Sequence, residues 1–362
     1  MQAGGIRHSS KNRRIWLFSA NFQPLDRPIP TRHVPAALVG GDVSSKIFDI
    51  SGKRIWVAGH RGMVGGAVAR RLGREKCEIL TVDHRDVDLT RQADVEHWLD
   101  KNRPDAIVMA AARVGGIHAN STLPAEFLSI NLMIGTNIVS AAHKAGVSRL
   151  INLGSSCMYP VGAPQPIAEA SLGAGPPEPT NAAYAMAKLA TAGMASTYRA
   201  RYDVGYVIVI PTNLYGPGDN FDPLMSHVAP ALMRRMIEAR DKNVAEVAIW
   251  GSGKPRRELM FVDDAADAIV FVLERYSAAE PINIGIGVDV SIRELADLTA
   301  KIVSYRGRLT FDASKPDGAP RRLLDNARLA ALGWRSSTDL ADGLGQMYRW
   351  YCNCNNKVNA AA

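Results

Sequence analysis

The chain has 362 residues, and its 47% hydrophobic content is enough to fill a substantial core. Its 31 glycines and 7% aromatic content fit an α/β protein with many tight turns better than a sandwich or a coiled coil. The formal net charge is +8, but residues 1–49 hold seven Lys or Arg against three Asp. The remaining chain is only mildly basic and has no long Lys/Arg block, so composition favours an acidic small molecule over nucleic acid as the partner.

Cysteine usage and hydropathy indicate a cytoplasmic protein. The four cysteines form no disulfide framework, and the Cys352-Asn353-Cys354 stretch lacks the companion ligands that a zinc site needs. No run of about 18 apolar residues is present to span a bilayer, and no apolar signal region precedes a small-residue cleavage site. We therefore expect no metal and no membrane segment.

Residues 1–49 carry scattered prolines and basic residues without a sustained period. This pattern predicts a flexible N-terminal extension. Because the segment is basic and poor in acids, a targeting peptide is the alternative interpretation.

From Lys53 the pattern changes to a strand, a glycine turn and a helix, with the apolar run at 54–58 and the helical stretch at 63–72. Strand-like runs recur along the chain, mostly separated by stretches long enough for helices, which predicts an α/β fold with a Rossmann-type, doubly wound parallel sheet. We expect residues 50–220 to form mainly the dinucleotide-binding domain and 221–355 mainly a smaller α/β substrate-binding domain. Part of 258–288 is expected to return to the first domain. The expected further strands are 78–82, 106–111, 150–153, 206–210, 247–250 and 282–284.

The turn between the first strand and helix has the Gly-xx-Gly-xx-Gly spacing of a dinucleotide site. The first glycine permits the tight turn, the second lets the backbone approach a pyrophosphate, and the third lets helix and strand pack closely. The helix N-terminus then faces the phosphates. The residues of this turn are Gly59, His60, Arg61, Gly62, Met63, Val64 and Gly65.

The end of the second strand bears on the choice between NAD and NADP. Asp83 lies where an acid would bind the adenosine ribose hydroxyls and favour NAD. Arg85, together with Arg61, could instead converge on a 2′-phosphate through charge-assisted bonds, and we favour NADP(H) on that basis. Asp88, before Leu89, lies where a side chain could accept a hydrogen bond from the adenine amino group.

Tyr184 and Lys188 form a Tyr-xxx-Lys pair, which shares one face if the segment is helical. The pair is a weak signal alone, but Ser155 follows the strand at 150–153, and open α/β sheets place ligands at the carboxyl ends of their strands. Because a free tyrosine has a pKa of about 10, proton transfer near neutral pH needs a nearby cation such as Lys188. Ser155 would hydrogen-bond the reacting oxygen.

The glycine turn, the stretch Leu153-Gly-Ser-Ser-Cys-Met-Tyr-Pro160, the Tyr184/Lys188 pair and Pro211-Thr-Asn-Leu-Tyr-Gly-Pro217 resemble the extended short-chain dehydrogenase/reductase family. Longer motifs at 111–116, 250–253 and 312–318 are similar to one branch of it, and the similarity runs from about Lys53 to about Tyr351. The resemblance implies a two-step NADPH-dependent conversion of GDP-4-keto-6-deoxy-D-mannose to GDP-L-fucose, by epimerisation at C3 and C5 and then reduction at C4. It also implies a homodimer, with 131–144 and 182–199 as candidate faces.

By the same resemblance Cys157 is the base and His227 the acid of the epimerisation, while Tyr184 protonates the C4 oxygen. Further cofactor-binding positions are Leu153, Gly154, Ser156, Lys188, Pro211, Thr212, Asn213 and Leu214. Substrate-binding positions are Asn213, His227, Arg235, Trp250, Arg257, Asp317 and Arg322. Arg113 departs from the pattern, which has Lys there.

Three alternatives remain at this stage. A nucleotide-sugar 4,6-dehydratase of this family generally needs an Asp-Glu pair, whereas no carboxylate occurs between Gly154 and Ala168. A 4-epimerase needs only the Tyr and Lys, which leaves Cys157 and His227 without a function. A non-catalytic NADP-binding sensor could share the fold, because fold does not fix function.

Overall fold

The structure is a computed structural model that describes residues 46–315 and 317–361. Most of the expected flexible extension at 1–49 therefore lies outside the described residues. The described residues belong to one structural unit, which begins at Val43.

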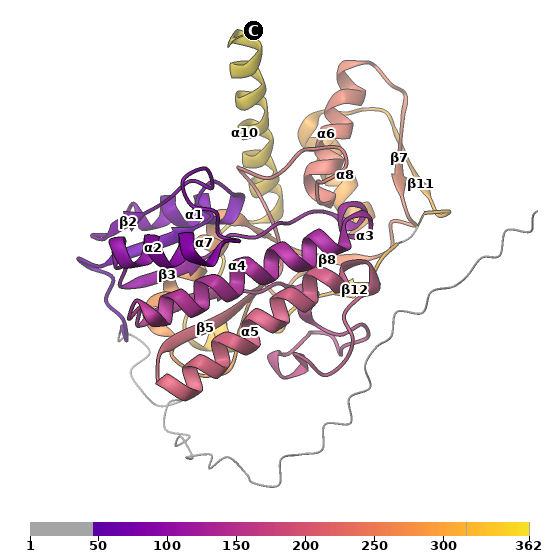
Figure 1. Cartoon of the computed structure of the whole chain (residues 1–362). Coiled ribbons are helices and arrows are strands. Elements are labelled where there is room, and N and C mark those ends of the chain that lie inside the picture. The colour runs from indigo at the N-terminus through magenta and orange to yellow at the C-terminus, as the bar shows by residue number, and fades with distance from the viewer. Residues whose placement is uncertain (1–45, 316, 362) are drawn as a thin grey trace, which may run out of the picture. The chain divides into compact units, whose positions relative to one another are not determined.

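A six-stranded parallel sheet forms the centre of the nucleotide-binding region, in the strand order β2-β1-β3-β4-β5-β9 (Figure 1). Strand order reverses beside β1, and open α/β sheets bind ligands at the carboxyl ends of strands at such a point. The predicted Rossmann-type doubly wound sheet is confirmed. The strands are β1 (Arg54–Ala58), β2 (Glu78–Leu80), β3 (Ala106–Met109), β4 (Arg149–Leu153), β5 (Gly205–Pro211) and β9 (Ile282–Ile284).

Helices cover both faces of this sheet. In β1, Ile55 and Val57 enter the apolar core shared with α1 (Met63–Leu72) and α7 (Val262–Arg275). Their neighbours Trp56 and Ala58 enter the opposite core, which includes residues of α2 (Gln92–Asn102), α4 (Pro124–Lys144) and α5 (Ala182–Tyr202). This alternation explains why the strand reads as continuously apolar, since each face of the sheet is buried.

Helix α4 is long and apolar enough to cross a membrane by length and composition, with a mean hydropathy of 1.2. A single helix of this kind is weak evidence, because core helices meet the same criterion. Here α4 lies alongside α5 (Figure 1) and contributes Phe127, Ile134 and Ile138 to the buried interior.

The second region holds two smaller sheets and its own apolar core. Strand β8 (Arg256–Phe261) pairs with β10 (Asp289–Ser291), β12 (Arg321–Arg322) and β6 (Asn213–Tyr215). Strand β7 (Glu246–Trp250) pairs with β11 (Arg308–Asp312). The core between them is built with α6 (Val228–Asp241), α8 (Ile292–Val303) and α10 (Leu340–Ala361).

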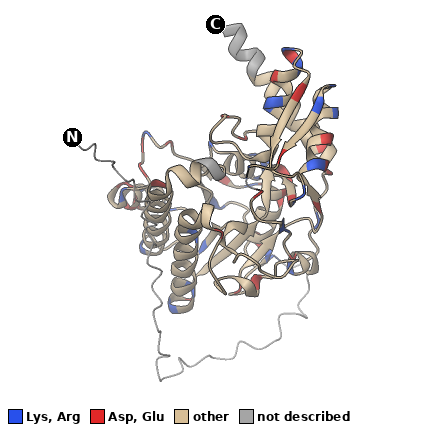
Figure 2. Ribbon diagram, turned by 90° about the vertical axis from the view of Figure 1, so that its right-hand side faces the viewer, with Lys and Arg blue, Asp and Glu red and all other residues tan. Residues whose placement is uncertain are grey.

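The chain passes from β8 into α7 and β9, and so returns to the six-stranded sheet. The domain boundaries, including the return of part of 258–288 to the first domain, stay a prediction. Short helices connect the rest: α3 (Ile117–Thr122), α9 (Ala327–Ala331), η1 (Ser156–Met158), η2 (Glu169–Ser171) and η3 (Pro179–Asn181). Lys/Arg and Asp/Glu are interspersed along the described helices and strands (Figure 2).

Candidate active site

The glycine turn joins β1 to α1, and its glycines have no side chains that would block a ligand from approaching the protein backbone. Gly59 has φ +86°, and a Cβ there would lie 2.6 Å from the backbone nitrogen of Ala111. A Cβ on Gly65 would overlap the carbonyl oxygen of Gly59. Gly62 is the N-cap of α1 and provides no side-chain cap, so the first N–H groups of that helix are open to an anion. The residues present therefore fit a dinucleotide diphosphate.

The adenosine end of this site carries an ion pair that joins the turn to the segment after β2. Arg61 Nη1 lies 3.0 Å from Asp83 Oδ1, and His60 Nε2 lies 3.8 Å from the same oxygen. Arg85 is exposed, and no described residue pairs with it. Two guanidinium groups are thus available near this point, one of them engaged by a carboxylate.

Asp88 and Leu89 each accept hydrogen bonds from neighbouring protein groups. Asp88 Oδ1 accepts hydrogen bonds from the backbone N–H of Thr90 at 2.9 Å and its hydroxyl at 2.7 Å, and these bonds lower the pKa of Asp88. The carbonyl of Leu89 accepts from Asn137 Nδ2 at 3.0 Å. Met63 and Val64 pack against the α1/α7 core.

The structure brings Ser155, Tyr184 and Lys188 together at the carboxyl end of β4. Lys188, 7% exposed, donates from Nζ to the Leu153 carbonyl at 2.8 Å, and burial lowers the pKa of Lys188 to about 8. Its Nζ lies 6.0 Å from the centre of the Tyr184 ring. Burial raises the pKa of Tyr184, and the nearby Cys157 raises it further, whereas a side-chain hydrogen bond with Ser155 opposes the shift.

Cys157 lies in η1, directly beside this group. Ser155 Oγ accepts from the Cys157 N–H at 3.2 Å, which caps the short helix. Arg322 Nη1 lies 3.3 Å from Cys157 Sγ, although the two residues are far apart in sequence. The contact places a guanidinium next to the sulfur atom that the epimerisation would use as its base.

A second arginine stands next to Arg322. Parallel pairing of β12 with β8 sets Arg322 beside Arg257. Burial lowers the pKa of Arg257 to about 10, and the charge of Arg322 lowers it further in the same direction. Two adjacent guanidinium groups, one largely buried, suit an anionic ligand such as a diphosphate.

His227 is the N-cap residue of α6 and follows a tightly held loop. The Met225 carbonyl accepts from the Gly116 N–H at 2.9 Å, and the Phe221 ring lies 4.3 Å from that of Tyr351 in α10. The His227 side chain is open to solvent, while the protein that surrounds it lowers its pKa through desolvation. No hydrogen bond or ion pair among the described residues joins His227 to Cys157.

The other predicted substrate residues lie in the second region. Trp250 is 61% exposed, and Lys315 Nζ lies 5.7 Å from its ring centre. Asp317 accepts hydrogen bonds from the N–H and hydroxyl of Ser252 at 2.6 and 2.7 Å, which lower the pKa of Asp317. Arg235 is partly buried and donates to the Ala248 carbonyl of β7.

The predicted cofactor residues of β4 and β5 lie at neighbouring strand ends. Gly154 N–H donates to the Val209 carbonyl at 2.8 Å, and Ser156 is buried. Pro211 pairs with Ile284, and Leu214 packs against the core. Thr212 Oγ1 and Asn213 Nδ2 donate to the Glu258 carbonyl at 3.2 and 3.1 Å.

Glu258 is a site residue that no sequence motif indicated. It is fully buried, and burial raises its pKa. Its Oε1 accepts from the N–H groups of Ile286 and Gly287 at 2.6 and 2.8 Å, and its Oε2 from Leu324 at 3.0 Å. This carboxyl group joins the loop after β9 to the segment that follows Arg322.

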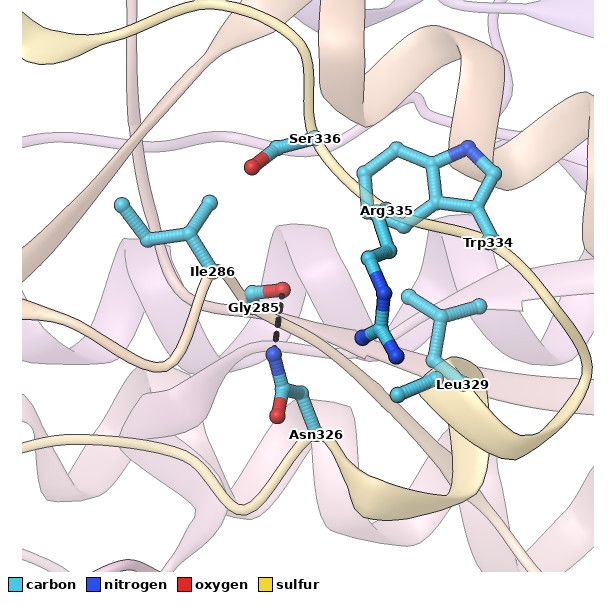
Figure 3. Close-up of a pocket in the computed structure, with 8 residues that line it drawn as sticks. Gly285, Ile286, Asn326, Leu329, Trp334, Arg335 and Ser336 are labelled. Atoms are coloured by element: carbon cyan, nitrogen blue, oxygen red, sulfur yellow. Dashed lines mark hydrogen bonds between the residues drawn. The ribbon is translucent and has the colours of Figure 1, made fainter.

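Two cavities among the described residues lie apart from the predicted catalytic side chains. One of about 140 Å³ is bounded by the end of β9, with Leu329 and Trp334 as apolar walls (Figure 3). Asn326 donates to the Gly285 carbonyl across it at 3.4 Å. A second, of about 420 Å³, shares Trp334 and Arg335 with the first and is rich in ion-paired side chains of α1 and α7. Neither includes Ser155, Cys157 or Tyr184.

Comparison with known proteins agrees with this geometry. Residues 55–285 match the NAD dependent epimerase/dehydratase family. The chain is 50% identical over 317 residues to GDP-L-fucose synthase 1 of Arabidopsis thaliana, covering 87% of this chain and 98% of that relative. It is 47% identical over 312 residues to GDP-L-fucose synthase of Escherichia coli strain K12, covering 83% and 97%.

Among solved structures, a GDP-L-fucose synthetase from Naegleria fowleri bound to NADP superposes with a TM-score of 0.79 at 27% identity. The superposition covers 86% of this chain and 98% of that one. The chain therefore belongs to the NAD dependent epimerase/dehydratase family, within the extended short-chain dehydrogenases/reductases.

Proposed function

We propose that the protein converts GDP-4-keto-6-deoxy-D-mannose to GDP-L-fucose with NADPH, as an oxidoreductase that is also an epimerase. The observation that carries the proposal is the position of Cys157: a thiol that contacts Arg322 stands beside the Ser155/Tyr184/Lys188 group. A reductase without epimerase activity needs only the Ser155/Tyr184/Lys188 group, and not Cys157. The names of relatives at about 50% identity point to the same reaction, so neither another epimerase/reductase nor a non-catalytic sensor is favoured.

The cofactor is NADP(H), which supplies a hydride to C4 of the sugar when bound. The open N-terminus of α1 and the glycine turn suit its diphosphate, and Arg61 and Arg85 suit its 2′-phosphate. The NADP-bound Naegleria relative supports this choice. We assign Lys188 and the strand-end positions 153, 154, 156 and 211–214 to cofactor binding.

In the epimerisation, the Cys157 thiolate removes a proton from C3 or C5. Both carbons adjoin the C4 ketone, so the electron pair of the broken C–H bond moves into an enolate whose charge rests on the C4 oxygen. A hydrogen bond from Ser155 to that oxygen stabilises the charge. His227 returns a proton on the opposite face, which inverts the carbon. The lowered pKa of His227 makes its protonated imidazole a stronger acid for this step.

In the reduction, Tyr184 donates its phenolic proton to the C4 oxygen. The raised pKa of Tyr184 keeps it protonated until the hydride arrives at C4. The Lys188 ammonium then stabilises the tyrosinate that remains. Arg257, Arg322 and Arg235 are assigned to the GDP diphosphate, and Trp250, Asp317 and Asn213 to the sugar or nucleoside.

We further propose a cytoplasmic homodimer with no nucleic acid or membrane partner. Exposed Met133 of α4 and Met186 of α5, 40% and 52% exposed, lie on neighbouring helices and suit burial against a second copy. Along the part of the chain that the structure describes, Lys/Arg and Asp/Glu alternate without a long basic tract of the kind that tracks a phosphate backbone (Figure 2).

The test supplies the protein with GDP-4-keto-6-deoxy-D-mannose and NADPH in D2O, following NADPH absorbance and the position of deuterium in the product by NMR. We expect GDP-L-fucose with deuterium at C3 and C5. Cys157→Ala should slow label uptake by about 10²- to 10⁴-fold, the usual contribution of a general base, without weakening NADPH binding. Cys77→Ala is the matched control, because this thiol lies directly before β2 and donates to the Leu72 carbonyl at the end of α1. Neither label nor oxidation in the parent protein, or equal label in Cys157→Ala, would contradict the proposal.

A further inference from the structure

The segment that follows β2 places a carboxylate at the adenosine end of the cofactor site. Parallel pairing of β1 with β2 ends with Trp56 beside Leu80. Asp83 follows three residues later, and its Oδ1 lies 3.0 Å from Arg61 Nη1 in the glycine turn. An acid here ordinarily binds the ribose 2′-hydroxyl of NADH, whereas NADPH carries a phosphate on that oxygen. Asp83 is therefore unfavourable for the phosphate and favourable for the hydroxyl.

Asp83 also forms an ion pair with Arg61, the cation that NADPH needs for its 2′-phosphate. Asp83 Oδ1 is inaccessible to solvent and lies between Arg61 Nη1 at 3.0 Å and His60 Nε2 at 3.8 Å. The Arg61 side chain is 62% exposed, and ion pairs this exposed add little to stability. The ion pair thus has more effect on what Arg61 can bind than on the fold.

Arg85 is a second cation near Arg61, and unlike Arg61 it is not paired with a carboxylate among the described residues. Arg85 is exposed, and the described residues offer it no ion-pair partner, so it can meet a 2′-phosphate directly. Arg61 must either leave Asp83 or share its guanidinium between the carboxylate and the phosphate. His60 Nδ1 is buried and has no hydrogen-bond partner in the described part of the chain, which leaves the imidazole held only through its Nε2 side.

We infer that Asp83 is a specificity-determining residue which, through its ion pair with Arg61, reduces the preference for NADPH over NADH and makes this protein able to use both cofactors. The inference rests on the proposed function, because it concerns the cofactor of that reaction. The carboxylate repels the 2′-phosphate and retains Arg61, so it weakens NADPH binding. The same carboxylate accepts a hydrogen bond from the 2′-hydroxyl, so it strengthens NADH binding.

The test measures equilibrium binding of NADPH and of NADH by isothermal titration calorimetry, without sugar substrate. Asp83→Asn removes the negative charge that pairs with Arg61, so it should tighten NADPH binding about three- to tenfold at low salt. The same variant should weaken NADH binding by a few-fold. Asp86→Asn, an exposed carboxylate three residues further along, makes the same charge change without a described contact to Arg61 and should leave the NADPH/NADH ratio unchanged.

Each outcome bears on one claim. Opposite shifts of the two affinities in Asp83→Asn alone support the inference. NADPH binding that is tight in the parent and unchanged in Asp83→Asn, or shifted equally in Asp86→Asn, overturns the inference and leaves the proposed function intact. A parent protein that binds neither cofactor overturns both.

Discussion

At the residue scale, the pKa of Lys188 is the property that links burial to catalysis. Lys188 donates to the Leu153 carbonyl and has no carboxylate partner there, so burial favours its neutral form and lowers its pKa to about 8. Its ammonium is the form that stabilises the tyrosinate of Tyr184. That form is present below pH 8 and is lost as the pH rises through 8.

We therefore expect kcat/KM for NADPH in the reduction to fall above about pH 8, by up to tenfold per pH unit, because kcat/KM follows the ionisation of the free protein. Lys188→Arg should remove this decline, since a guanidinium stays charged across the range. Stopped-flow NADPH oxidation between pH 6 and 10 gives the profile. A parent profile that stays level to pH 10 would remove Lys188 from this role.

Local spacing made part of this site predictable. Tyr184 and Lys188 are one helical turn apart, and Ser155 follows a buried strand, so a sequence pattern could group them. The Cys157–Arg322 contact joins residues 165 positions apart, and it depends on how β12 pairs with β8. Glu258 interacts with backbone N–H groups of two distant loops, for which a sequence has no local signal.

At the element scale, the glycine turn leaves no space for a side chain at Gly65. A Cβ on Gly65 would overlap the Gly59 carbonyl, so either α1 or the end of β1 must move. We expect Gly65→Ala to weaken NADPH binding at least tenfold and to lower the free energy of unfolding by about 1–3 kcal/mol, the usual cost of overpacking. Calorimetric titration measures the NADPH affinity, and chemical denaturation measures the free energy of unfolding.

Gly345→Ala in α10 is the control, because its Cβ would meet only the flexible end of Arg349 at 3.5 Å. Glycine inside a helix is unfavourable relative to alanine, so this change should raise the free energy of unfolding by about 0.5–1 kcal/mol and leave NADPH binding unchanged. Equal NADPH affinity in the Gly65 and Gly345 variants would refute the close-approach argument.

The strands of the six-stranded sheet followed from the sequence, but some of their boundaries did not. The runs at 78–82 and 106–111 were expected to be strands throughout, whereas β2 ends at Leu80 and β3 at Met109. β2 is an edge strand that pairs only with β1. After β3 the chain turns so that Ala111 passes close to Gly59. Both endings are set by tertiary contacts that apolar periodicity does not record.

At the scale of the whole molecule, the order of apolar runs was enough to predict the doubly wound sheet, because buried parallel strands read as apolar runs separated by helices. The small sheets of the second region were harder to foresee. Strand β12 has only two residues, Arg321 and Arg322, and its sequence carries no β pattern. It forms because β8 offers a free edge beside Arg256 and Arg257.

The proposed dimer makes a prediction at this scale. Met133→Glu and Met186→Glu each place a charge on the exposed side of the α4/α5 pair, and burying an unpaired charge in an interface is strongly unfavourable. Sedimentation equilibrium should show a dimeric parent and weakened dimers or monomers for both variants. Val288→Glu, at a 63% exposed position outside these helices, should remain dimeric. A parent protein that is monomeric in this experiment would contradict the proposed interface.

The central claim is that one site performs two separable reactions, proton exchange at Cys157 and reduction at Tyr184. The most direct measurement follows Tyr184→Phe with GDP-4-keto-6-deoxy-D-mannose and NADPH in D2O. Because the phenylalanine retains the ring but cannot donate a proton, NADPH oxidation should fall by about 10²- to 10⁴-fold. Deuterium should still enter C3 and C5 of the unreduced sugar. Loss of both label and oxidation together, or oxidation at the parent rate, would contradict the account.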